Sequence, residues 1–254
     1  MPEPLYRVRG LTKKYGERTV LEQVDFDVLR GECLVILGRS GSGKSVMLRQ
    51  LNGLEKSDAG SVELDGIDLA QLEEKELFPL RRRIAMLFQS GALFDSMNVF
   101  DNIAFPLREH TDMPAGEIAE TVGRKLAMVN LKDKDVQRKM PSDLSGGMRK
   151  RVALARSLAL DPEVVLFDEP TTGLDPVTSA TIGKLINSIQ KELGVTSVVV
   201  THDIPLARRV GDRLAFLSNR RFSFLGDWTE ADNSEDAELA SFLAGREQED
   251  EDAA

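Results

Sequence analysis

Two short stretches of the sequence carry residue types that can hold and attack phosphate groups. The first, residues 38–45, reads Gly-Arg-Ser-Gly-Ser-Gly-Lys-Ser and fits the pattern G-x-x-x-x-G-K-[ST]. Its glycines let backbone N–H groups turn toward a phosphate, its lysine can reach the outer phosphates, and its last serine can ligate Mg²⁺. The pattern predicts a nucleotide-binding loop made of Gly38, Arg39, Ser40, Gly41, Ser42, Gly43, Lys44, Ser45 and Val46.

The second stretch, residues 164–170, is an apolar run that ends in two carboxylates and a proline. A run that is apolar at every position is typical of a strand buried on both faces of a parallel sheet, and open α/β sheets bind ligands where such strands end. Asp168 is therefore expected to hold Mg²⁺ or its waters, and Glu169 to polarise an attacking water as a general base. An ordinary surface turn after a core strand is the alternative, which the phosphate loop makes less favourable.

A third stretch, Leu-Ser-Gly-Gly at residues 144–147, precedes a predicted helix whose first turn carries Arg149, Lys150 and Arg151. Cations there oppose the helix dipole, which favours anions at the N-terminus. When a sequence places cations where the helix dipole disfavours them, a functional reason is indicated, and a bound phosphate would supply one. Taken alone, a glycine-containing loop before an exposed basic helix face explains the stretch equally well.

The elements that must position these residues alternate between strands and helices. Before residue 91 we expect strands at 20–29, 33–37 and 61–64 and a helix at 45–52. Between 91 and 160 the β signal fades and apolar residues recur at helical spacing over 118–131, which predicts a helical insertion. Beyond residue 163 we expect a strand at 164–167, a helix at 177–193, a strand at 197–201, a helix at 205–210, a hairpin at 213–218 and 221–225, and a helix around 234–243. This alternation predicts a parallel sheet with right-handed crossovers.

The composition excludes several classes of protein. With 254 residues, 41% hydrophobic and 30% charged, the chain can bury a real core and is not disordered throughout. Its apolar runs are far shorter than the roughly 20 residues of a membrane-spanning helix, and no hydrophobic signal segment opens it, so we expect it neither to span a membrane nor to be secreted by that route. The single Cys33 fits a buried strand position in a reducing compartment.

The charge balance is acidic. A net charge of −9 argues against a nucleic-acid partner, because such proteins usually carry a basic excess on one face. Much of the imbalance is local, since residues 247–252 read Glu-Gln-Glu-Asp-Glu-Asp. We therefore expect residues 247–254 to form an acidic, disordered tail after a single domain at residues 1–246.

Taken together and in this order, the motifs resemble those of the nucleotide-binding subunits of ABC transporters, over about residues 5–226. Besides the stretches above, the resemblance rests on Gln89 as the glutamine loop, Asp175 within Gly-Leu-Asp-Pro as the D-loop, and His202 as the switch histidine. Residues 144–147 match the family signature. Tyr15, in Lys-Lys-Tyr-Gly, lies where the family places an aromatic ring that stacks on adenine, although a lone tyrosine near a strand end is more often a core residue.

The resemblance implies an α/β fold of the P-loop NTPase class and the ABC ATPase type. Its core sheet would be mostly parallel, with antiparallel strands near the N-terminus and a helical signature subdomain inserted at about 91–160. It implies ATP and Mg²⁺ as cofactors, with Glu169, His202 and Lys44 catalytic. The metal would be held by Ser45, Gln89 and Asp168.

The resemblance also implies a head-to-tail homodimer with two shared ATP molecules. Each nucleotide would lie between the phosphate loop of one copy and Ser145, Gly146, Gly147 and Asp175 of the other. The sequence agrees with this arrangement, because residues 144–147 lie about a hundred residues beyond the loop and offer a second anion site.

Residues 86–111 resemble more narrowly the ATPase subunit of Mla-type, Mce-associated lipid transport systems, as does Met148 where many relatives have glutamine. That resemblance implies a separate transmembrane permease, an Mce-type lipid-binding protein, a possible small regulatory subunit, no nucleic acid, and a peripheral position on the cytoplasmic face of a bacterial inner membrane. Candidate permease contacts are Leu93, Phe94, Met97, Val99 and Phe100. The alternative is that these five side chains pack inside the helical subdomain.

Three other functions remain in competition. The same motor could serve another cargo, such as an amino acid or a lipoprotein, against which only residues 86–111 argue. A soluble ABC-type ATPase acting on nucleic acid or ribosomes would usually carry long coiled coils or two tandem cassettes, and the sequence has neither. A nucleotide-binding regulator without turnover conflicts with the presence of both Glu169 and His202.

Overall fold

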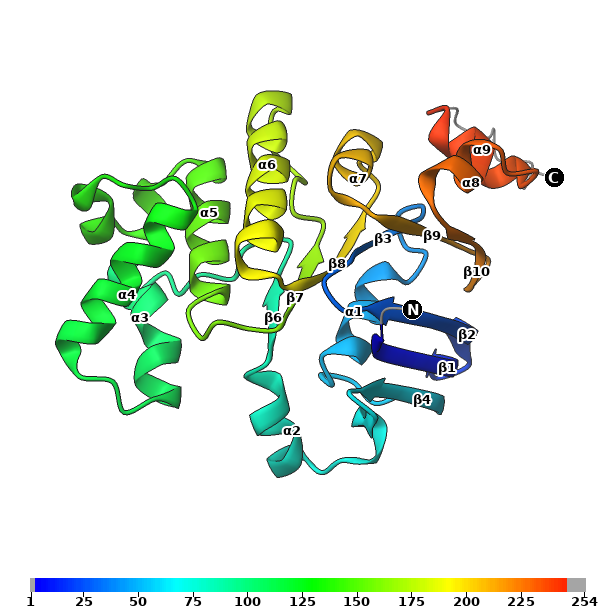
Figure 1. The fold of residues 1–254 in the computed structure, drawn as a ribbon, viewed down its shortest axis with the longest axis horizontal. Helices are drawn as coiled ribbons and strands as arrows, with labels where there is room; N and C mark the ends of the chain where they lie inside the picture. Colours follow the sequence, from blue (N-terminus) through cyan, green and yellow to red (C-terminus); the bar gives the residue numbers. More distant parts are fainter. Residues whose placement is uncertain (1–2, 246–254) are drawn as a thin grey trace.

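Two β-sheets organise residues 3–245, the part of the chain that the computed structural model describes. The first is a six-stranded sheet of order β10-β9-β3-β8-β7-β6, and the second a four-stranded sheet of order β2-β1-β4-β5 (Figure 1). The predicted domain boundary at 246 and the predicted tail at 247–254 lie outside the described residues.

The six-stranded sheet is mostly parallel, as expected. Strands β3, β6, β7, β8 and β9 run parallel, and β10 closes the edge antiparallel to β9. The strands are β3 (Cys33–Leu37), β6 (Ile84–Leu87), β7 (Val164–Asp168), β8 (Thr196–Thr201), β9 (Arg213–Ser218) and β10 (Arg221–Gly226). Every residue of β3, β7 and β8 is buried, because both faces of the sheet are covered.

The strand register brings the sequence motifs to one edge. In the parallel ladders Leu37 pairs with Thr201, Asp168 with Val200, and Leu87 with Phe167. The carboxyl ends of β3, β6, β7 and β8 are therefore level with one another. The four loops that carry the predicted site residues must leave the sheet side by side.

The four-stranded sheet is antiparallel and is built from the N-terminal third of the chain. Its strands are β1 (Pro4–Tyr15), β2 (Arg18–Leu29), β4 (Ala59–Leu64) and β5 (Ile67–Asp68). It packs with helix α1 (Lys44–Leu51) over one face of the central sheet, where alternate residues of β3 such as Leu34 and Ile36 join the same core. The opposite residues of β3, Cys33 and Val35, point into the core under the other helices.

Helices cover the second face of the central sheet and form one end of the molecule (Figure 1). The helices after α1 are α2 (Glu74–Arg81), α3 (Val99–His110), α4 (Ala115–Met128), α5 (Gly146–Ser157), α6 (Pro176–Leu193), α7 (Ile204–Val210), α8 (Trp228–Asp232) and α9 (Ala237–Leu243). Short 3₁₀ turns lie at η1 (Leu69–Gln71), η2 (Lys134–Arg138) and η3 (Pro141–Asp143). Helices α3, α4 and α5 make up the expected helical insertion.

Side-chain caps fix where several helices begin. Asn98 accepts a hydrogen bond from the backbone N–H of Asp101 at the start of α3, and Asp175 accepts from Val177 and Thr178 at the start of α6. Helix α6 ends at Gly194, whose φ of +64° suits a glycine at a helix C-terminus. These residues determine where α3 and α6 begin and where α6 ends.

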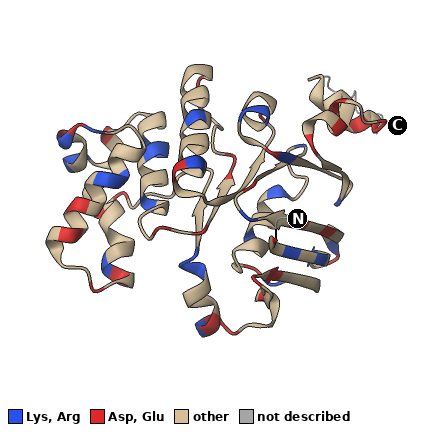
Figure 2. Ribbon diagram, in the orientation of Figure 1, with Lys and Arg blue, Asp and Glu red and all other residues tan. Residues whose placement is uncertain are grey.

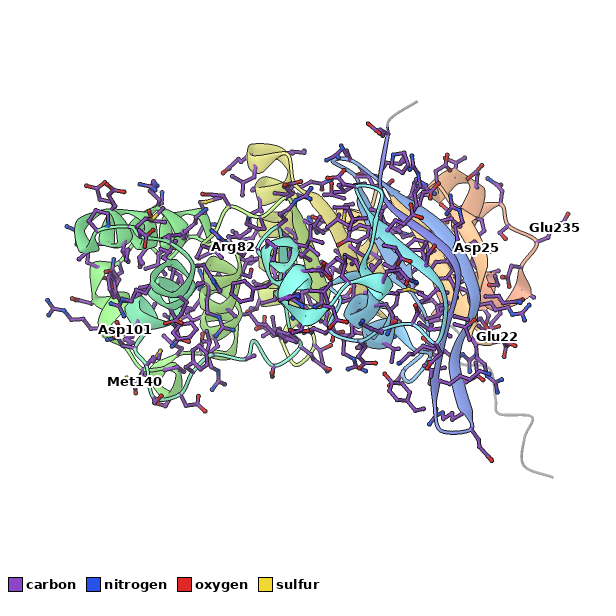
Figure 3. The ribbon with its side chains drawn as sticks, turned by 90° about the horizontal axis from the view of Figure 1, so that it is seen from below. Glu22, Asp25, Arg82, Asp101, Met140 and Glu235 are labelled. Carbon is purple, nitrogen blue, oxygen red and sulfur yellow. The ribbon has the colours of Figure 1, made fainter. Side chains whose placement is uncertain are left out.

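The helical end and the antiparallel sheet lie at opposite ends of an elongated molecule. Seen from below, Asp101 and Met140 mark one end, and Glu22 and Asp25 lie toward the other (Figure 3). Both signs of charge occur along α3 and α4, as expected of helix faces that meet water, whereas α5 carries only Lys and Arg (Figure 2). Among residues 3–245, no helix is both long enough and apolar enough to cross a bilayer.

The structure differs from the sequence prediction in a few elements. Helix α2 lies in a region predicted only as strands and turns, and α8 has no counterpart in the prediction, whereas the predicted helix around 234–243 is α9. Pro79 and Pro106 sit inside α2 and α3, where proline usually argues against a helix. Tertiary packing outweighs local preference there, since Leu77 and Leu107 are buried in the two cores.

Candidate nucleotide site

The loop between β3 and α1 has a backbone that only glycine can follow at two of its positions. Gly43 has a φ of +109°, and a Cβ there would lie 3.0 Å from the Val20 side chain. A Cβ on Gly38 would lie 2.6 Å from the carbonyl oxygen of Leu217. The glycines are thus required by close packing and by backbone conformation, and they leave the start of α1 open as an anion site.

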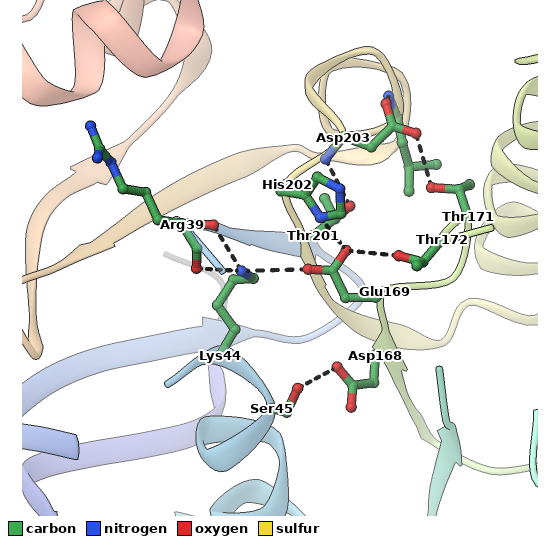
Figure 4. A network of polar contacts seen from close by, with 12 residues as sticks. Arg39, Lys44, Ser45, Asp168, Glu169, Thr171, Thr172, Thr201, His202 and Asp203 are labelled. Carbon is green, nitrogen blue, oxygen red and sulfur yellow. Dashed lines mark hydrogen bonds and ion pairs between the residues drawn. The ribbon is translucent and has the colours of Figure 1, made fainter. Parts of the chain in front are cut away.

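Lys44 begins α1 and turns back over the loop (Figure 4). Its Nζ donates hydrogen bonds to the carbonyl oxygens of Gly38, at 2.7 Å, and of Arg39, at 2.9 Å, and it lies 3.4 Å from Glu169 Oε1. Burial lowers the pKa of Lys44, and the charge of Glu169 acts against that shift. The ammonium is therefore held ready in the loop beside the carboxylate that follows β7.

Ser45 and Asp168 meet below the lysine. The Ser45 hydroxyl donates to Asp168 Oδ1 at 2.7 Å (Figure 4). Burial raises the pKa of Asp168, and the hydrogen bond from Ser45 opposes this rise. The pair presents hydroxyl and carboxylate oxygens at one point, a donor set that suits a hard divalent cation.

Glu169 is one residue further on and points in a different direction. Its φ of +46° is uncommon for a residue with a side chain, and such strain is concentrated at functional sites. Its Oε2 lies 2.9 Å from His202 Nδ1 and accepts a hydrogen bond of 3.4 Å from the Thr172 hydroxyl (Figure 4). The carboxylate thus lies between Lys44 and His202, where a base can act on a water near a bound phosphate.

Two further bonds hold the turn that carries His202. Asp203 caps α7 by accepting from the backbone N–H of Leu206, and its other carboxylate oxygen accepts from the Thr171 hydroxyl at 2.9 Å. The loop after β7 and the loop after β8 are therefore tied to each other. The imidazole of His202 remains 60% exposed, so it faces the solvent side of the site.

These side chains border an open cleft of about 1300 Å³. The expected residues that line it are Tyr15, Arg39, Ser40, Gly41, Gly43, Lys44, Ser45, Val46, Gln89, Glu169 and His202. Gly38, Ser42 and Asp168 are not on its wall; Gly38 packs against Leu217 and Ser42, and Asp168 supports Ser45. The structure therefore gathers the loop, strand and histidine motifs around one cavity.

Several lining residues escaped the sequence analysis: Arg18, Val20, Thr172, Ile204, Phe242 and Gly245. Thr172 could have been found, because it follows Glu169 by three residues. Phe242 could not, because it comes from α9 and reaches the cleft by packing on the Phe216 ring at 5.2 Å between centroids.

Tyr15 is 45% exposed at the end of β1 and is not a core residue. Its hydroxyl donates to Glu55, and the Lys13 ammonium lies 5.5 Å from the ring centroid. Burial raises the pKa of Tyr15, as does its hydrogen bond to Glu55. An exposed ring at the rim of a phosphate-binding cleft is available for stacking on a base.

The signature residues lie away from this cleft. The Ser145 hydroxyl accepts from the backbone N–H of Met148 and caps α5, while Gly146 borders a separate pocket of about 410 Å³. A Cβ on Gly147 would lie 2.5 Å from Thr178 Cγ2, so this glycine lets α5 pack on the first turn of α6. Asp175 caps that same turn, next to Gly147 but outside the cleft lining.

The basic residues after the signature have partners inside the chain. Lys150 is buried and donates to the carbonyl oxygen of Gln89, and Arg151 donates to those of Gly147 and Asn130. Only Arg149 is exposed. These backbone acceptors account for the positions of Lys150 and Arg151 without a bound phosphate, and an anion near the start of α5 stays a prediction.

The five permease-contact candidates differ in how exposed their side chains are. Val99 is 0% exposed in the helical core, so it offers no surface and its prediction as a contact is wrong in this structure, because the start of α3 faces inward. Leu93 and Phe100 are half-buried against the same core. Phe94 is exposed, with the Phe105 ring at 4.9 Å and the Arg156 guanidinium at 5.4 Å. Contact with a partner stays a prediction for Leu93, Phe94, Met97 and Phe100.

The fold and the cleft together define a P-loop NTPase. A parallel sheet delivers a glycine-rich loop, a buried lysine and two carboxylates to one edge, as nucleoside triphosphate hydrolysis requires. The family model described as ABC transporter matches residues 21–172. The chain belongs to the ABC transporter family, among its ATP-binding subunits.

Similar proteins and solved structures agree with this family assignment. The chain is 44% identical over 239 residues to the probable ribonucleotide transport ATP-binding protein mkl of Mycobacterium tuberculosis, covering 94% of this chain and 66% of that protein. It is 40% identical over 241 residues to the intermembrane phospholipid transport system ATP-binding protein MlaF of Escherichia coli. That match covers 95% of this chain and 89% of that protein. A dimeric ATP-binding cassette bound to ADP and Pi superposes with a TM-score of 0.80 at 34% identity, over 87% of this chain and 98% of that one.

Proposed function

We propose that this chain binds ATP in the cleft and hydrolyses it with Glu169 as the general base. The observation that carries the proposal is the Glu169 carboxylate, strained at φ +46° and held between Lys44 Nζ at 3.4 Å and His202 Nδ1 at 2.9 Å. A buried carboxylate with partners on both sides is fixed in place before substrate arrives.

The loop residues have separate roles in this proposal. The backbone N–H groups of residues 39–45 and the start of α1 receive the β and γ phosphates, and Lys44 neutralises them. Since Lys44 Nζ already bonds to two loop carbonyls, only its contact with Glu169 has to loosen when a phosphate enters. Tyr15 stacks on the adenine ring at the other end of the cleft.

The residues present fit Mg²⁺. Ser45 and Asp168 supply hydroxyl and carboxylate oxygens, and Gln89 lines the same cleft with a side-chain amide oxygen. Among residues 3–245 there is no group of three or more His, Cys, Asp or Glu side chains that could hold a metal alone. This suits Mg²⁺, which takes one or two protein ligands together with phosphate oxygens and waters. When bound, it would neutralise charge that builds up on the phosphates.

His202 and the signature residues complete the proposed site from two directions. His202 faces the cleft from the end of β8, bonded to Glu169, and can report the presence of a γ-phosphate to that base. Ser145, Gly146, Gly147 and Asp175 are outside the chain's own cleft, so we propose that they bind the nucleotide of a second copy. The dimeric arrangement of a similar cassette supports this.

The motion of such a dimer would drive transport through a separate permease at the cytoplasmic face of a bacterial inner membrane. Phospholipid as cargo, with an Mce-type lipid-binding protein as a further partner, is supported by residues 86–111 and by the names of the relatives from Escherichia coli and Haemophilus influenzae. The relative from Mycobacterium tuberculosis favours ribonucleotides instead, because its name states ribonucleotide transport.

Purification of the tagged chain from solubilised membranes of its native host tests the proposal. We expect recovery of a polytopic permease and a lipid-binding protein, ATP hydrolysis by the isolated assembly, and loss of that hydrolysis with Glu169→Gln. Phospholipid in the purified assembly supports the lipid cargo, while stimulation of hydrolysis by ribonucleotides favours the alternative. Recovery of soluble or ribosomal proteins alone would contradict a transport function.

A further inference from the structure

Lys150 is a buried cation whose hydrogen bond leads to the nucleotide cleft. It lies on α5, one turn beyond the signature residues, and is 6% exposed. Its Nζ donates to the backbone carbonyl oxygen of Gln89, whose side chain lines the cleft. Burying a lysine is costly unless the charge is compensated, so this contact needs a reason.

Two more contacts join α5 to the same segment. The Arg156 guanidinium donates to the carbonyl oxygen of Gly91 at 3.3 Å. A Cβ on Gly91 would lie 3.3 Å from the Cβ of Ala153, so the segment rests directly on the helix. Lys150, Ala153 and Arg156 are three residues apart along α5 and share one face of it.

The charge of Lys150 is balanced from the catalytic side. Burial lowers its pKa, and the charges of Asp168 and Glu169 act against that shift. No carboxylate of residues 3–245 forms an ion pair with it, so these two act at longer range while the carbonyl of Gln89 is its direct partner. The cation is therefore held by the carboxylates of the site and by the loop that borders it.

We propose that Lys150 is a positioning residue, which fixes the backbone at Gln89 so that the glutamine side chain reaches the nucleotide cleft and moves together with the signature helix. A helix of twelve residues transmits a displacement of its first turn to the next. A ligand that engages Ser145 and Gly147 would thereby also set the position of Gln89. The inference rests on the proposed function, since it assigns Gln89 to the metal and phosphate side of that site.

A purely structural role for Lys150 is the competing explanation, and the chain offers a matched control. Lys125 is also buried in the helical subdomain, at 4% exposure, but donates to Asp161 and not to the Gln89 segment. Lys150→Met and Lys125→Met each remove one buried ammonium. Lys150→Arg keeps a charged donor at the same position and serves as the conservative variant.

Two measurements on the full chain test the role. Amide hydrogen exchange followed by mass spectrometry, without nucleotide, should be faster in peptides covering residues 84–98 for Lys150→Met, and unchanged there for Lys125→Met and Lys150→Arg. In ATP hydrolysis assays the Mg²⁺ concentration for half-maximal rate should rise by about tenfold for Lys150→Met, because partners of a metal-binding residue tune its affinity. A smaller folded fraction would lower the rate without moving this midpoint.

The outcomes separate the two proposals. Unchanged exchange in residues 84–98, equal effects of Lys150→Met and Lys125→Met, or an unmoved Mg²⁺ midpoint would each overturn the positioning role. If Lys150→Met does not fold, Lys150→Gln replaces it, since its side chain is too short to keep the bond. Absence of hydrolysis by the unmodified chain would refute the proposed function, while the exchange comparison still decides whether Lys150 holds the segment.

Discussion

The two halves of the proposed ATP site differ in how completely one chain builds them. On the cleft side, Lys44, Ser45, Asp168, Glu169 and His202 are linked by short polar contacts, and three of the five, Lys44, Asp168 and Glu169, are buried. On the signature side, Ser145 and Asp175 make only the bonds that cap their own helices. Only the first side lines the large cleft of its own chain, while on the signature side Gly146 borders the separate, smaller pocket.

The difference shows that one chain can assemble half of a site on its own and still depend on a second molecule for the other half. The parallel register of β3, β7 and β8 assembles the cleft side during folding, without any partner. The signature side is a capped helix N-terminus next to a second one, which can receive an anion brought by another molecule. Variants of the cleft side should therefore change nucleotide binding and turnover, whereas variants of the signature side should leave nucleotide binding in their own cleft unchanged and change the hydrolysis that two chains carry out together.

The largest expected effect comes from the cleft side. Glu169→Gln removes the base but keeps a side chain of the same shape between Lys44 and His202. We expect the rate of ATP hydrolysis to fall at least about 100-fold, with ATP binding retained. Steady-state hydrolysis assays measure the rate, and nucleotide-binding assays measure the affinity for ATP. Hydrolysis at the parental rate would show that Glu169 is not the base.

Lys44→Ala should act on binding instead. The variant loses the buried ammonium that faces the phosphates, so we expect ATP affinity to fall by about tenfold to a hundredfold, the usual range for a hydrogen bond to a charged group. Titration with a fluorescent ATP analogue measures this. Lys125→Ala is the control for removing a buried lysine away from the cleft, and an equal loss of affinity in both variants would contradict the assignment.

A stability measurement sharpens the description of the signature side. Gly147→Ala places a Cβ 2.5 Å from Thr178 Cγ2, and the threonine cannot turn away without losing its hydroxyl bond to Asp175. We expect a loss of about 1 kcal/mol in the free energy of unfolding, as for mild overpacking.

Urea unfolding measures the loss, and Thr178→Ser in the same chain should restore much of it. Gly146→Ala is the matched control, because a Cβ there meets Leu174 at an ordinary 3.5 Å. Equal costs for the two glycines would show that α5 does not pack on α6 as described.

The smallest expected effect concerns the cap of α6. The hydrogen bond from the Thr178 hydroxyl, together with the backbone N–H groups of Thr178 and Val177, lowers the pKa of Asp175. Because the folded-state pKa is the lower one, the stability that ionised Asp175 contributes is present above the ordinary aspartate pKa and is lost as pH falls through the lowered value.

Asp175→Asn does not titrate, so the difference in urea midpoint between parent and variant should shrink from about pH 7 to about pH 3. A difference that stays constant across this range would contradict a role for the ionised carboxylate.

The sequence predicts the cleft well because its geometry follows from local rules. Residues 164–167 are apolar throughout and must form a buried strand, and in a parallel sheet its carboxyl end lies at the same edge as that of residues 33–37, with β8 between the two. Lys44, Ser45, Asp168 and Glu169 follow directly from those strands. For the same reason His202, one residue beyond β8, reaches the same edge.

What the sequence does not predict depends on packing between distant segments. Phe242 reaches the cleft through its contact with Phe216, and no pattern near residue 242 indicates that. Val99 begins an amphipathic helix, and only the assembled helical subdomain determines that it faces inward. The helix-dipole argument for Lys150 takes no account of the carbonyl oxygen of Gln89, to which its ammonium donates a hydrogen bond.

The central claim is that the two halves of one ATP site come from two copies of the chain, and subunit mixing tests it most directly. Lys44→Ala spoils the cleft side and Ser145→Arg obstructs the signature side, so each homodimer should be inactive. A mixed dimer contains one intact site, and random pairing predicts up to about a quarter of the unmodified activity. Hydrolysis by the mixture above that of either variant alone is the result we predict, and a mixture no more active than its components would contradict the shared site.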